Sequence, residues 1–165
     1  MRKILLLAGL ALGVTSLAQA QTKISATALC AAPNPTHVLS VGDTPDHAYA
    51  VAQGTCKWTK PWEIGGLKNT EGVGTQIQEV KGETTKVRGT FVDTMGNGDK
   101  AFYNFDFTLL AKKTGPEVMN HKWDLTGGTG KLQGVKGQGT CKATPVGSDG
   151  SFNYDCSGEY TLPKP

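Results

Sequence analysis

The most constraining feature of the sequence is a strict period-two pattern near its C-terminal end. In the run that begins at Val135, every second position holds a small or apolar residue, among them Gly137, Gly139 and Cys141. After the turn PVGSDG, the run SFNYDCSGEYTL places phenylalanine, tyrosine, cysteine and glycine at alternate positions. Alternation of this kind is typical of β-strands whose two faces meet different surroundings. The pattern therefore predicts an antiparallel hairpin with one face turned inward.

A single register of this hairpin places all its apolar and glycine positions on one face. That register sets Cys141 opposite Cys156 and Lys142 opposite Asp155, whereas a slip by one residue would scramble both faces. Directly opposed strand residues have Cβ atoms about 4.5 to 5.5 Å apart, which local twist can close to disulfide geometry. We therefore predict a disulfide between Cys141 and Cys156.

The middle of the chain predicts a second hairpin in the same way. VRGTFVDTM and KAFYNFDFTL flank residues 96–98, whose Gly-Asn-Gly sequence suits a three-residue hairpin loop. The matching register pairs Phe91 with Tyr103 and Gly89 with Phe105. An inward row of aromatic rings would then cover a glycine.

A further hairpin is expected upstream, where VGTQIQEV turns at Gly82 and brings Ile77 beside Val87. This register turns Glu79 inward, and alternation in the following strand does the same for Asp93. We interpret each carboxylate as a solvated residue at the rim of the fold, because an unpaired buried carboxylate is costly.

The remaining cysteines also suit disulfides. The pentapeptide QGTCK occurs twice, around Cys56 and around Cys141, so both cysteines are expected on inward faces. The partner of Cys56 is then Cys30, or Cys156 if the first and last strands are neighbours. No two cysteines have the spacing of about two to four residues that structural zinc sites favour, so we predict disulfides rather than a metal site.

These segments and a strand near residues 117–124 amount to about six or seven strands, each with one polar and one apolar face. No helical pattern is present to cover the apolar face, so the sheet closes on itself. We predict an all-β protein: a small closed antiparallel β-barrel of about eight strands over residues 47–165, preceded by an N-terminal extension over residues 21–46. Outward cations such as Lys86 and Arg88 oppose an outer-membrane barrel, whose outer face is apolar.

The first 20 residues have the pattern of a secretory signal peptide, with two cations, an apolar run and Ala18-Gln19-Ala20 before the cleavage point. We expect an exported protein, periplasmic or extracellular, with no transmembrane segment after removal of the signal. Loss of Arg2 and Lys3 with the signal leaves 15 of the 17 cations against 14 acidic residues. This balance gives no electrostatic footprint for nucleic acid, and four cysteines suit an oxidising compartment.

The glycine-rich stretch GGTGKLQGVKGQGT, residues 127–140, lacks the spacing of a phosphate-binding loop. Leu125 and Leu132 stand where a Walker motif needs glycine and a hydroxyl residue. Together with the preceding WDLT, the stretch resembles the strand, turn and strand of the allene oxide cyclase and dirigent barrels, and of small exported bacterial proteins of unassigned role. The resemblance covers residues 123–143. It implies a calycin-like barrel that holds an oxidised fatty acid or guides phenoxy radical coupling inside, and it carries over no catalytic residue.

The inward aromatic side chains are the candidate ligand-binding residues: Trp58, Phe91, Tyr103, Phe105, Tyr154 and Tyr160. Inward glycines such as Gly89 and Gly139 would leave a cavity among them, or rings from across the barrel would fill that space at native packing density. Buried tyrosine hydroxyls need partners, which are each other or a ligand. Trp62 leaves its strand after Pro61 and either lines the mouth of the barrel or plugs it.

An acidic turn and the histidines are the remaining metal candidates. Asp43, Asp46 and His47 cluster in VGDTPDHAY, and His37 and His121 are the only other histidines. A turn with a capping aspartate explains the cluster without a metal. The sequence also lacks a Gly-x-Ser-x-Gly elbow. We assign no metal ligand, no catalytic residue and no cofactor.

Three functions fit this sequence. The first is a non-enzymatic exported barrel that binds a small apolar or aromatic molecule. The second is a cyclase or isomerase acting on a hydrophobic substrate, with Tyr103 and either Glu79 or Asp93 as its polar groups. The third is a structural envelope protein whose barrel is filled. The sequence leaves the oligomeric state open.

Overall fold

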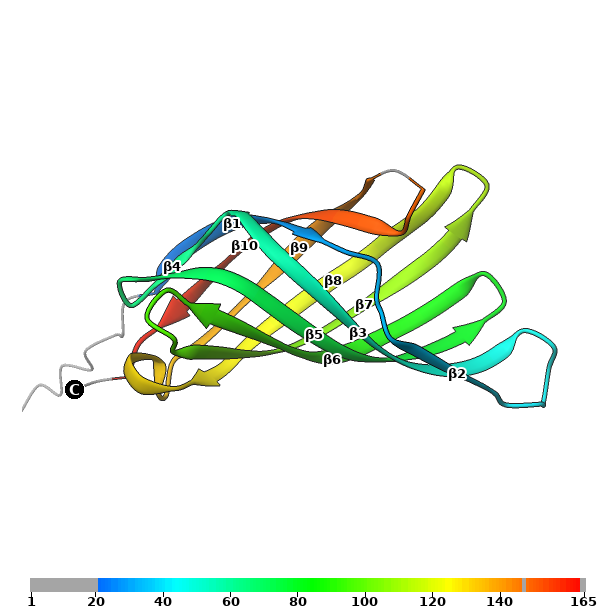
Figure 1. Ribbon diagram of the computed structural model, residues 1–165, viewed down its shortest axis with the longest axis horizontal. Coiled ribbons are helices and arrows are strands. Elements are labelled where there is room, and N and C mark those ends of the chain that lie inside the picture. Colours follow the sequence, from blue (N-terminus) through cyan, green and yellow to red (C-terminus); the bar gives the residue numbers. More distant parts are fainter. Residues whose placement is uncertain (1–20, 147, 164–165) are drawn as a thin grey trace, which may run out of the picture.

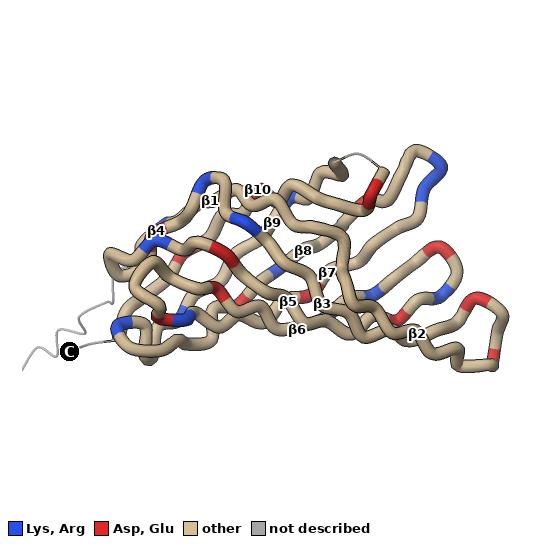
Figure 2. Tube along the Cα trace, viewed as in Figure 1, with Lys and Arg blue, Asp and Glu red and all other residues tan. Residues whose placement is uncertain are grey.

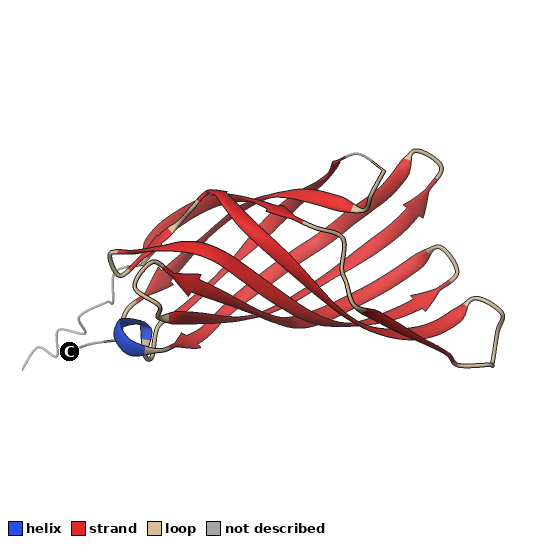
Figure 3. Ribbon diagram, in the orientation of Figure 1, coloured by secondary structure: helices blue, strands red, loops and turns tan. Residues whose placement is uncertain are grey.

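The structure is a computed structural model that describes residues 21–146 and 148–163. The expected signal peptide, residues 1–20, lies outside the described residues. Most of the described chain is strand, with one short 3₁₀ helix (Figure 3). In chain order the elements are β1 (Thr22–Cys30), β2 (Thr36–Ser40), β3 (His47–Lys60), β4 (Glu63–Ile64), β5 (Leu67–Lys81), β6 (Thr84–Met95), β7 (Lys100–Lys112), β8 (Gly115–Gly128), η1 (Gly130–Leu132), β9 (Lys136–Val146) and β10 (Ser151–Thr161).

Eight strands form a closed antiparallel barrel, which confirms the predicted fold class. They follow one another in the order β3-β1-β10-β9-β8-β7-β6-β5, and pairing of β3 with β5 closes the ring (Figure 1). The short strands β2 and β4 pair with β3 and β5, respectively, outside this ring. Closure gives each barrel strand two neighbours, so the ring itself has no free edge.

Residues 21–46, expected as an extension before the barrel, supply one of its eight strands. β1 pairs with β10 along its whole length and with the end of β3 on its other side. Two of its inward residues are small, and these, Ala26 and Ala28, are only 3% and 1% exposed. Alanine is a weak strand former, so the segment has a weak strand signal. The barrel therefore begins at Thr22 rather than at His47.

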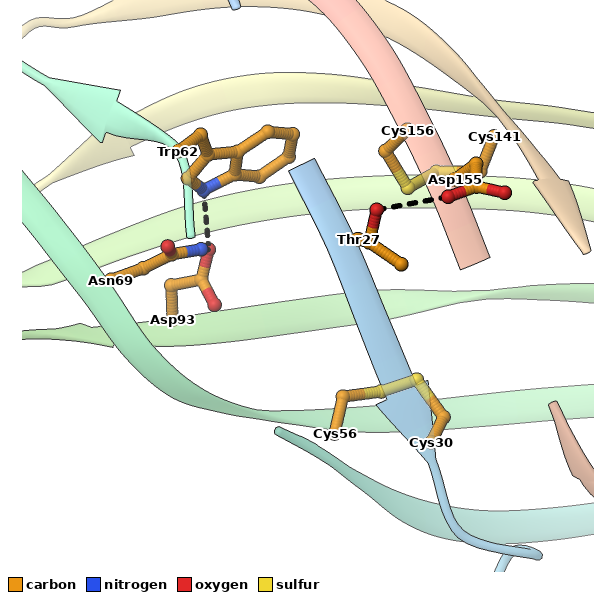
Figure 4. Close-up of a disulfide and its surroundings, with 9 residues drawn as sticks. All are labelled: Thr27, Cys30, Cys56, Trp62, Asn69, Asp93, Cys141, Asp155 and Cys156. Carbon is orange, nitrogen blue, oxygen red and sulfur yellow. Dashed lines mark hydrogen bonds between the residues drawn. A yellow bond between two sulfur atoms is a disulfide. The ribbon is translucent and has the colours of Figure 1, made fainter. Parts of the chain in front are cut away.

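The C-terminal hairpin has the predicted register, and both disulfides are present. β9 and β10 place Cys141 opposite Cys156, and the two form a disulfide. Cys30 pairs with Cys56 across β1 and β3, the first of the two alternatives that the sequence leaves open (Figure 4). Each disulfide therefore joins two neighbouring barrel strands.

The hairpin of β5 and β6 differs from its predicted register by one residue. Gly82, at φ +58°, forms a two-residue turn with the residue after it, and Ile77 therefore pairs with Arg88 instead of Val87. A slip of one residue reverses both faces of a strand. Ile77 is accordingly 46% exposed. The prediction that Glu79 points inward is also wrong, because its carboxylate accepts a hydrogen bond from an exposed tyrosine of β3 at the outer surface.

The glycine-rich stretch binds a carboxylate of its own chain. The Lys131 N–H and the Thr129 hydroxyl donate to Asp99, in the turn between β6 and β7, at 3.2 and 3.5 Å. Gly130 has φ +51°, and a Cβ there would stand 2.2 Å from an Asp99 oxygen. The strand predicted for the second half of the stretch is confirmed, since β9 begins at Lys136.

The two ends of the barrel are built differently. At one end, a buried cluster that includes Met95, Leu125 and Val135 fills the interior. Ile64 from β4 and Leu132 from η1, both 0% exposed, come from outside the ring of strands and complete this cluster. The turns β5–β6, β7–β8 and β9–β10 lie at the opposite end, on the right in Figure 1. We call these the closed end and the open end.

The outer surface carries charges of both signs. Figure 2 shows Lys and Arg interspersed with Asp and Glu along the strands and in the turns. Arg88, Asp106 and Lys122 face one another in a row across β6, β7 and β8 and alternate in sign, as expected for a solvated sheet face. In the described part of the chain, no helix has the length and apolarity needed to cross a membrane.

Candidate functional site

A cavity of about 340 Å³ occupies the barrel toward its open end. Small-molecule sites in proteins commonly have volumes of about 300 to 1,000 Å³. Inward side chains from all eight barrel strands form the wall. The deep part of the cavity is formed by Trp58, Trp62, Tyr103 and Trp123, whereas Phe152 lies toward the open end.

Four aromatic side chains form the floor of the cavity. Trp62 stacks on Tyr103 with ring centroids 5.6 Å apart, and its ring lies 4.8 Å from Trp58 and 5.2 Å from Trp123. Trp123 fits because the strand beside it carries glycine, since a Cβ at Gly139 would stand 2.2 Å from the indole ring. Glycine in a strand commonly marks such a close approach.

A buried carboxylate lies behind this floor. Asp93 is 0% exposed. It accepts hydrogen bonds from Trp58 Nε1 at 2.6 Å, and from Trp62 Nε1 and Asn69 Nδ2 at 3.2 Å each, the last two residues being drawn with it in Figure 4. The prediction of a solvated rim residue is wrong for Asp93, because these donors replace its hydration.

Burial governs the ionisation of the groups at the floor. It raises the pKa of Asp93 to about 6, against the lowering effect of the hydrogen bonds from its donors. Burial also raises the pKa of the Tyr103 hydroxyl well above its ordinary value, with the Asp93 charge as a further cause. Asp93 is withdrawn from the cavity, so it acts on the site by orienting the indole rings of Trp58 and Trp62.

One imidazole lies in the cavity wall. The ring centroid of His121, on β8, is 5.0 Å from Phe107, 5.2 Å from Tyr154 and 6.0 Å from Phe105. Burial lowers the pKa of His121 to about 4, so its ring is neutral at pH 7. Over the described residues, its Nδ1 has no hydrogen-bond partner, and the cavity wall contains no Lys, Arg, Asp or Glu.

The structure brings together five of the six predicted ligand-binding residues, namely Trp58, Phe91, Tyr103, Phe105 and Tyr154, in the cavity wall. Tyr160 instead packs in the cluster at the closed end, where its hydroxyl accepts a hydrogen bond from the Gly65 N–H at 3.2 Å. Trp62, which the sequence places at a mouth or in a plug, is 4% exposed and belongs to the floor. Ligand binding by these residues stays a prediction.

The sequence pattern suggests His121 only as a metal candidate and does not place it in the wall. Its position depends on irregular pairing between β7 and β8, with register shifts after Phe102 and after Asp106. No hydrophobic pattern indicates such shifts. The one local signal is Asn120, since asparagine tolerates a left-handed backbone better than most residues.

The acidic turn before β3 pairs with a histidine. His47 Nδ1 lies 2.7 Å from Asp43 Oδ1, and its Nε2 lies 3.4 Å from Glu79 Oε1. The hydrogen bond from His47 is the main cause that lowers the pKa of Asp43. No group of three His, Cys, Asp or Glu residues that could hold a metal ion occurs among the residues described. The cluster ties the turn to β5 on the outside of the barrel.

No protein-family model matches the sequence, and no curated protein matches it. Among solved structures, the chain is similar to the pterocarpan synthase dirigent protein GePTS1, with 12% sequence identity over 91% of this chain and 89% of that chain and a TM-score of 0.50. It also aligns with the pterocarpan synthase dirigent protein PsPTS1, with 13% identity over 88% of this chain and 97% of that chain and a TM-score of 0.47. The first likeness concerns the fold alone: the chain has a dirigent-like barrel.

Proposed function

We propose that this chain is an exported protein that binds a small apolar or aromatic molecule inside its barrel. The observation that carries the proposal is the cavity of about 340 Å³, which is open at one end and lined by aromatic rings. Protein interiors are otherwise close-packed, so an unfilled apolar space of this size favours an occupant. Burial of apolar ligand surface there would contribute about 25 cal/mol per Å².

The position of the carboxylates favours binding over catalysis. An enzyme of the cyclase or isomerase type, which the resemblance to allene oxide cyclases would imply, needs an acid or base within reach of its substrate. Asp93 lies behind the indole rings with 0% exposure, and Glu79 lies on the outer surface. A structural protein with a filled barrel would leave the cavity without a role.

Export is proposed from two features. Residues 1–20 have the pattern of a signal peptide, and the chain forms two disulfides, which persist in oxidising compartments. The mature protein would then begin at Gln21. We expect its mass, measured on protein secreted by its host, to correspond to a chain that begins at Gln21.

The binding proposal is tested by filling the cavity from one position. Gly54 lines the cavity, and a Cβ there would lie 3.9 Å or more from every neighbouring atom. The Cβ of Gly54→Phe therefore fits without moving the backbone, and we expect its ring to occupy part of the cavity. Thr55→Phe is the matched control, because Thr55 follows it on β3 and is exposed.

We expect the neutral fluorescent probe N-phenyl-1-naphthylamine to bind the wild-type protein in the micromolar range. Gly54→Phe should weaken this binding about tenfold, which corresponds to about 1.4 kcal/mol, whereas Thr55→Phe should leave it unchanged. The probe's fluorescence measures each Kd. Failure of the wild-type protein to bind, or equal binding by both variants, would contradict a ligand site inside the barrel.

A further inference from the structure

The pairing of β7 with β8 contains a bulge beside the cavity. Asp106 pairs with Lys122, but the next pair is Thr108 with Met119, so two residues of β8 stand opposite Phe107. Such bulges redirect side chains and are frequent next to functional sites. This one changes which residues of β8 face the barrel interior.

The extra residue of the bulge is Asn120, at φ +53°, the one non-glycine residue with a positive φ in residues 21–146 and 148–163. Because of it, both His121 and Val118 line the cavity, whereas Met119 is 38% exposed. Unbroken alternation would have turned Met119 inward together with His121. A left-handed backbone at a non-glycine residue is costly, and such positions cluster at functional sites.

The imidazole that this bulge holds in the wall has one buried ring nitrogen without a partner among residues 21–146 and 148–163. Its ring lies among Phe105, Phe107 and Tyr154, and over the described chain its Nδ1 lacks a hydrogen bond. A neutral imidazole always has one ring nitrogen that accepts a hydrogen bond. Buried polar groups are normally hydrogen-bonded, so an exception calls for an explanation.

We propose that His121 is the recognition residue of the cavity, where its neutral imidazole accepts a hydrogen bond from a hydroxyl or N–H group of an uncharged ligand. The apolar part of that ligand packs on the three neighbouring rings. The ligand is uncharged because the described wall holds no Lys, Arg, Asp or Glu to neutralise a charge, and burial of an unpaired charge is strongly unfavourable. This inference rests on the proposed function.

The test uses two probes that differ only in the donor. 2-Naphthol carries a hydroxyl, and 2-methoxynaphthalene has the same ring system with the hydroxyl blocked. We expect His121→Phe to weaken 2-naphthol binding about tenfold, as for the loss of one buried hydrogen bond, and to change 2-methoxynaphthalene binding less than twofold. Isothermal titration calorimetry at pH 7 measures both affinities.

Two further variants separate recognition from a structural role of His121. His121→Gln keeps a hydrogen-bond acceptor in the wall and should restore part of the 2-naphthol affinity. Asn120→Gly relieves the left-handed backbone but keeps the imidazole, so its affinity for both probes should equal that of the wild-type protein. Retained 2-methoxynaphthalene binding by His121→Phe shows that the cavity of that variant is intact.

The outcomes distinguish the two proposals. If neither probe binds the wild-type protein, the ligand-binding function fails, and this inference fails with it. A second outcome is that the wild-type protein binds both probes while His121→Phe weakens their binding equally, or leaves both affinities unchanged. Either result would mean that the barrel binds ligands but that His121 does not recognise the hydrogen-bond donor. If His121→Phe does not fold, 2-naphthol binding by His121→Gln at or below about one tenth of the wild-type affinity would likewise overturn the inference.

Discussion

The closed and open ends of the barrel are made from the same eight strands, but the buried groups Asp93 at one end and His121 at the other have different surroundings. At the closed end, Asp93 has three donors and no exposed surface. Toward the open end, His121 has no partner for Nδ1 among the described residues and borders a cavity. The comparison shows that closure of a sheet does not by itself fill a barrel, because the filling depends on side chains that reach across it.

Side chains from outside the barrel strands account for much of this difference. Trp62, Ile64 and Leu132 come from the β3–β5 connection and from η1, and each is at most 4% exposed in the closed-end core. At the open end, the described connections contribute mainly Ala31 and Pro33 to the cavity wall. These small side chains leave the space between the strands open.

The largest effect on stability is expected for removal of the carboxylate at the closed end. Asp93→Ala leaves two indole N–H groups and the Asn69 amide without their acceptor. Such unsatisfied groups cost about 1 to 3 kcal/mol each, of which the relieved burial of a charge offsets a part. We expect the free energy of unfolding in urea to fall by about 3 kcal/mol.

Asp124→Ala is the matched control for this measurement, because Asp124 is exposed on the outer face of β8. Its substitution should change the free energy of unfolding by less than about 0.5 kcal/mol. A loss below about 1 kcal/mol for Asp93→Ala would show that the buried network is not what stabilises the closed end.

A smaller difference in stability is expected when two inward glycines, one near each end, are replaced by alanine. A Cβ at Gly158 would stand 2.3 Å from the Gln138 carbonyl and 2.4 Å from the Trp123 ring, whereas at Gly54 the nearest atom is 3.9 Å away. Gly158→Ala should therefore lower the free energy of unfolding by about 2 kcal/mol. Gly54→Ala should change it by less than about 0.5 kcal/mol. Equal losses at the two positions would mean that the ends are equally packed.

The C-terminal hairpin was predictable because apolar or glycine residues alternate with polar residues along both of its strands. Cys141 and Cys156 face each other in a register that a shift of one residue would spoil, and the structure has that register. The same kind of pattern predicts the wrong register for β5. There the inward positions hold glycine and the amides Gln76 and Gln78, while Val73 and Ile77 face outward. Hydrophobicity therefore indicates the wrong face, and only the turn at Gly82 defines the register.

The sequence predicted most of the aromatic residues that line the candidate site, but not the positions of its polar groups. Phe91, Tyr103 and Phe105 line the cavity because alternation within a regular hairpin places them inward. The network of Asp93 depends on Asn69, which is far from it in sequence, and the position of His121 depends on a bulge. Long-range partners and bulges leave no periodic signal, so only the structure reveals them.

The smallest effect is expected in the pH dependence of stability, where the two ends oppose each other. The pKa of Asp93 is raised from 3.8 to about 6, so its contribution to stability is present below pH 3.8 and is lost as the pH rises through 6. The pKa of His121 is lowered from 6.5 to about 4, so its contribution is present above pH 6.5 and is lost as the pH falls through 4. Near pH 5, the contributions of Asp93 and His121 to the free energy of unfolding therefore change with pH in opposite directions and by nearly equal amounts.

Removal of the imidazole should reveal the opposing slope of Asp93. From pH 4.5 to 5.5, we expect the free energy of unfolding of His121→Phe, relative to the wild-type protein, to fall by about 1 kcal/mol per pH unit, because the wild-type protein gains stability from the lowered pKa of His121 as the pH rises and the variant does not. Urea unfolding at a series of pH values measures this difference and cancels the titration of the exposed carboxylates. His37→Phe, on the exposed strand β2, should follow the wild-type protein. If His121→Phe does so too, the imidazole titrates as in the unfolded chain, and the open end does not hold it neutral.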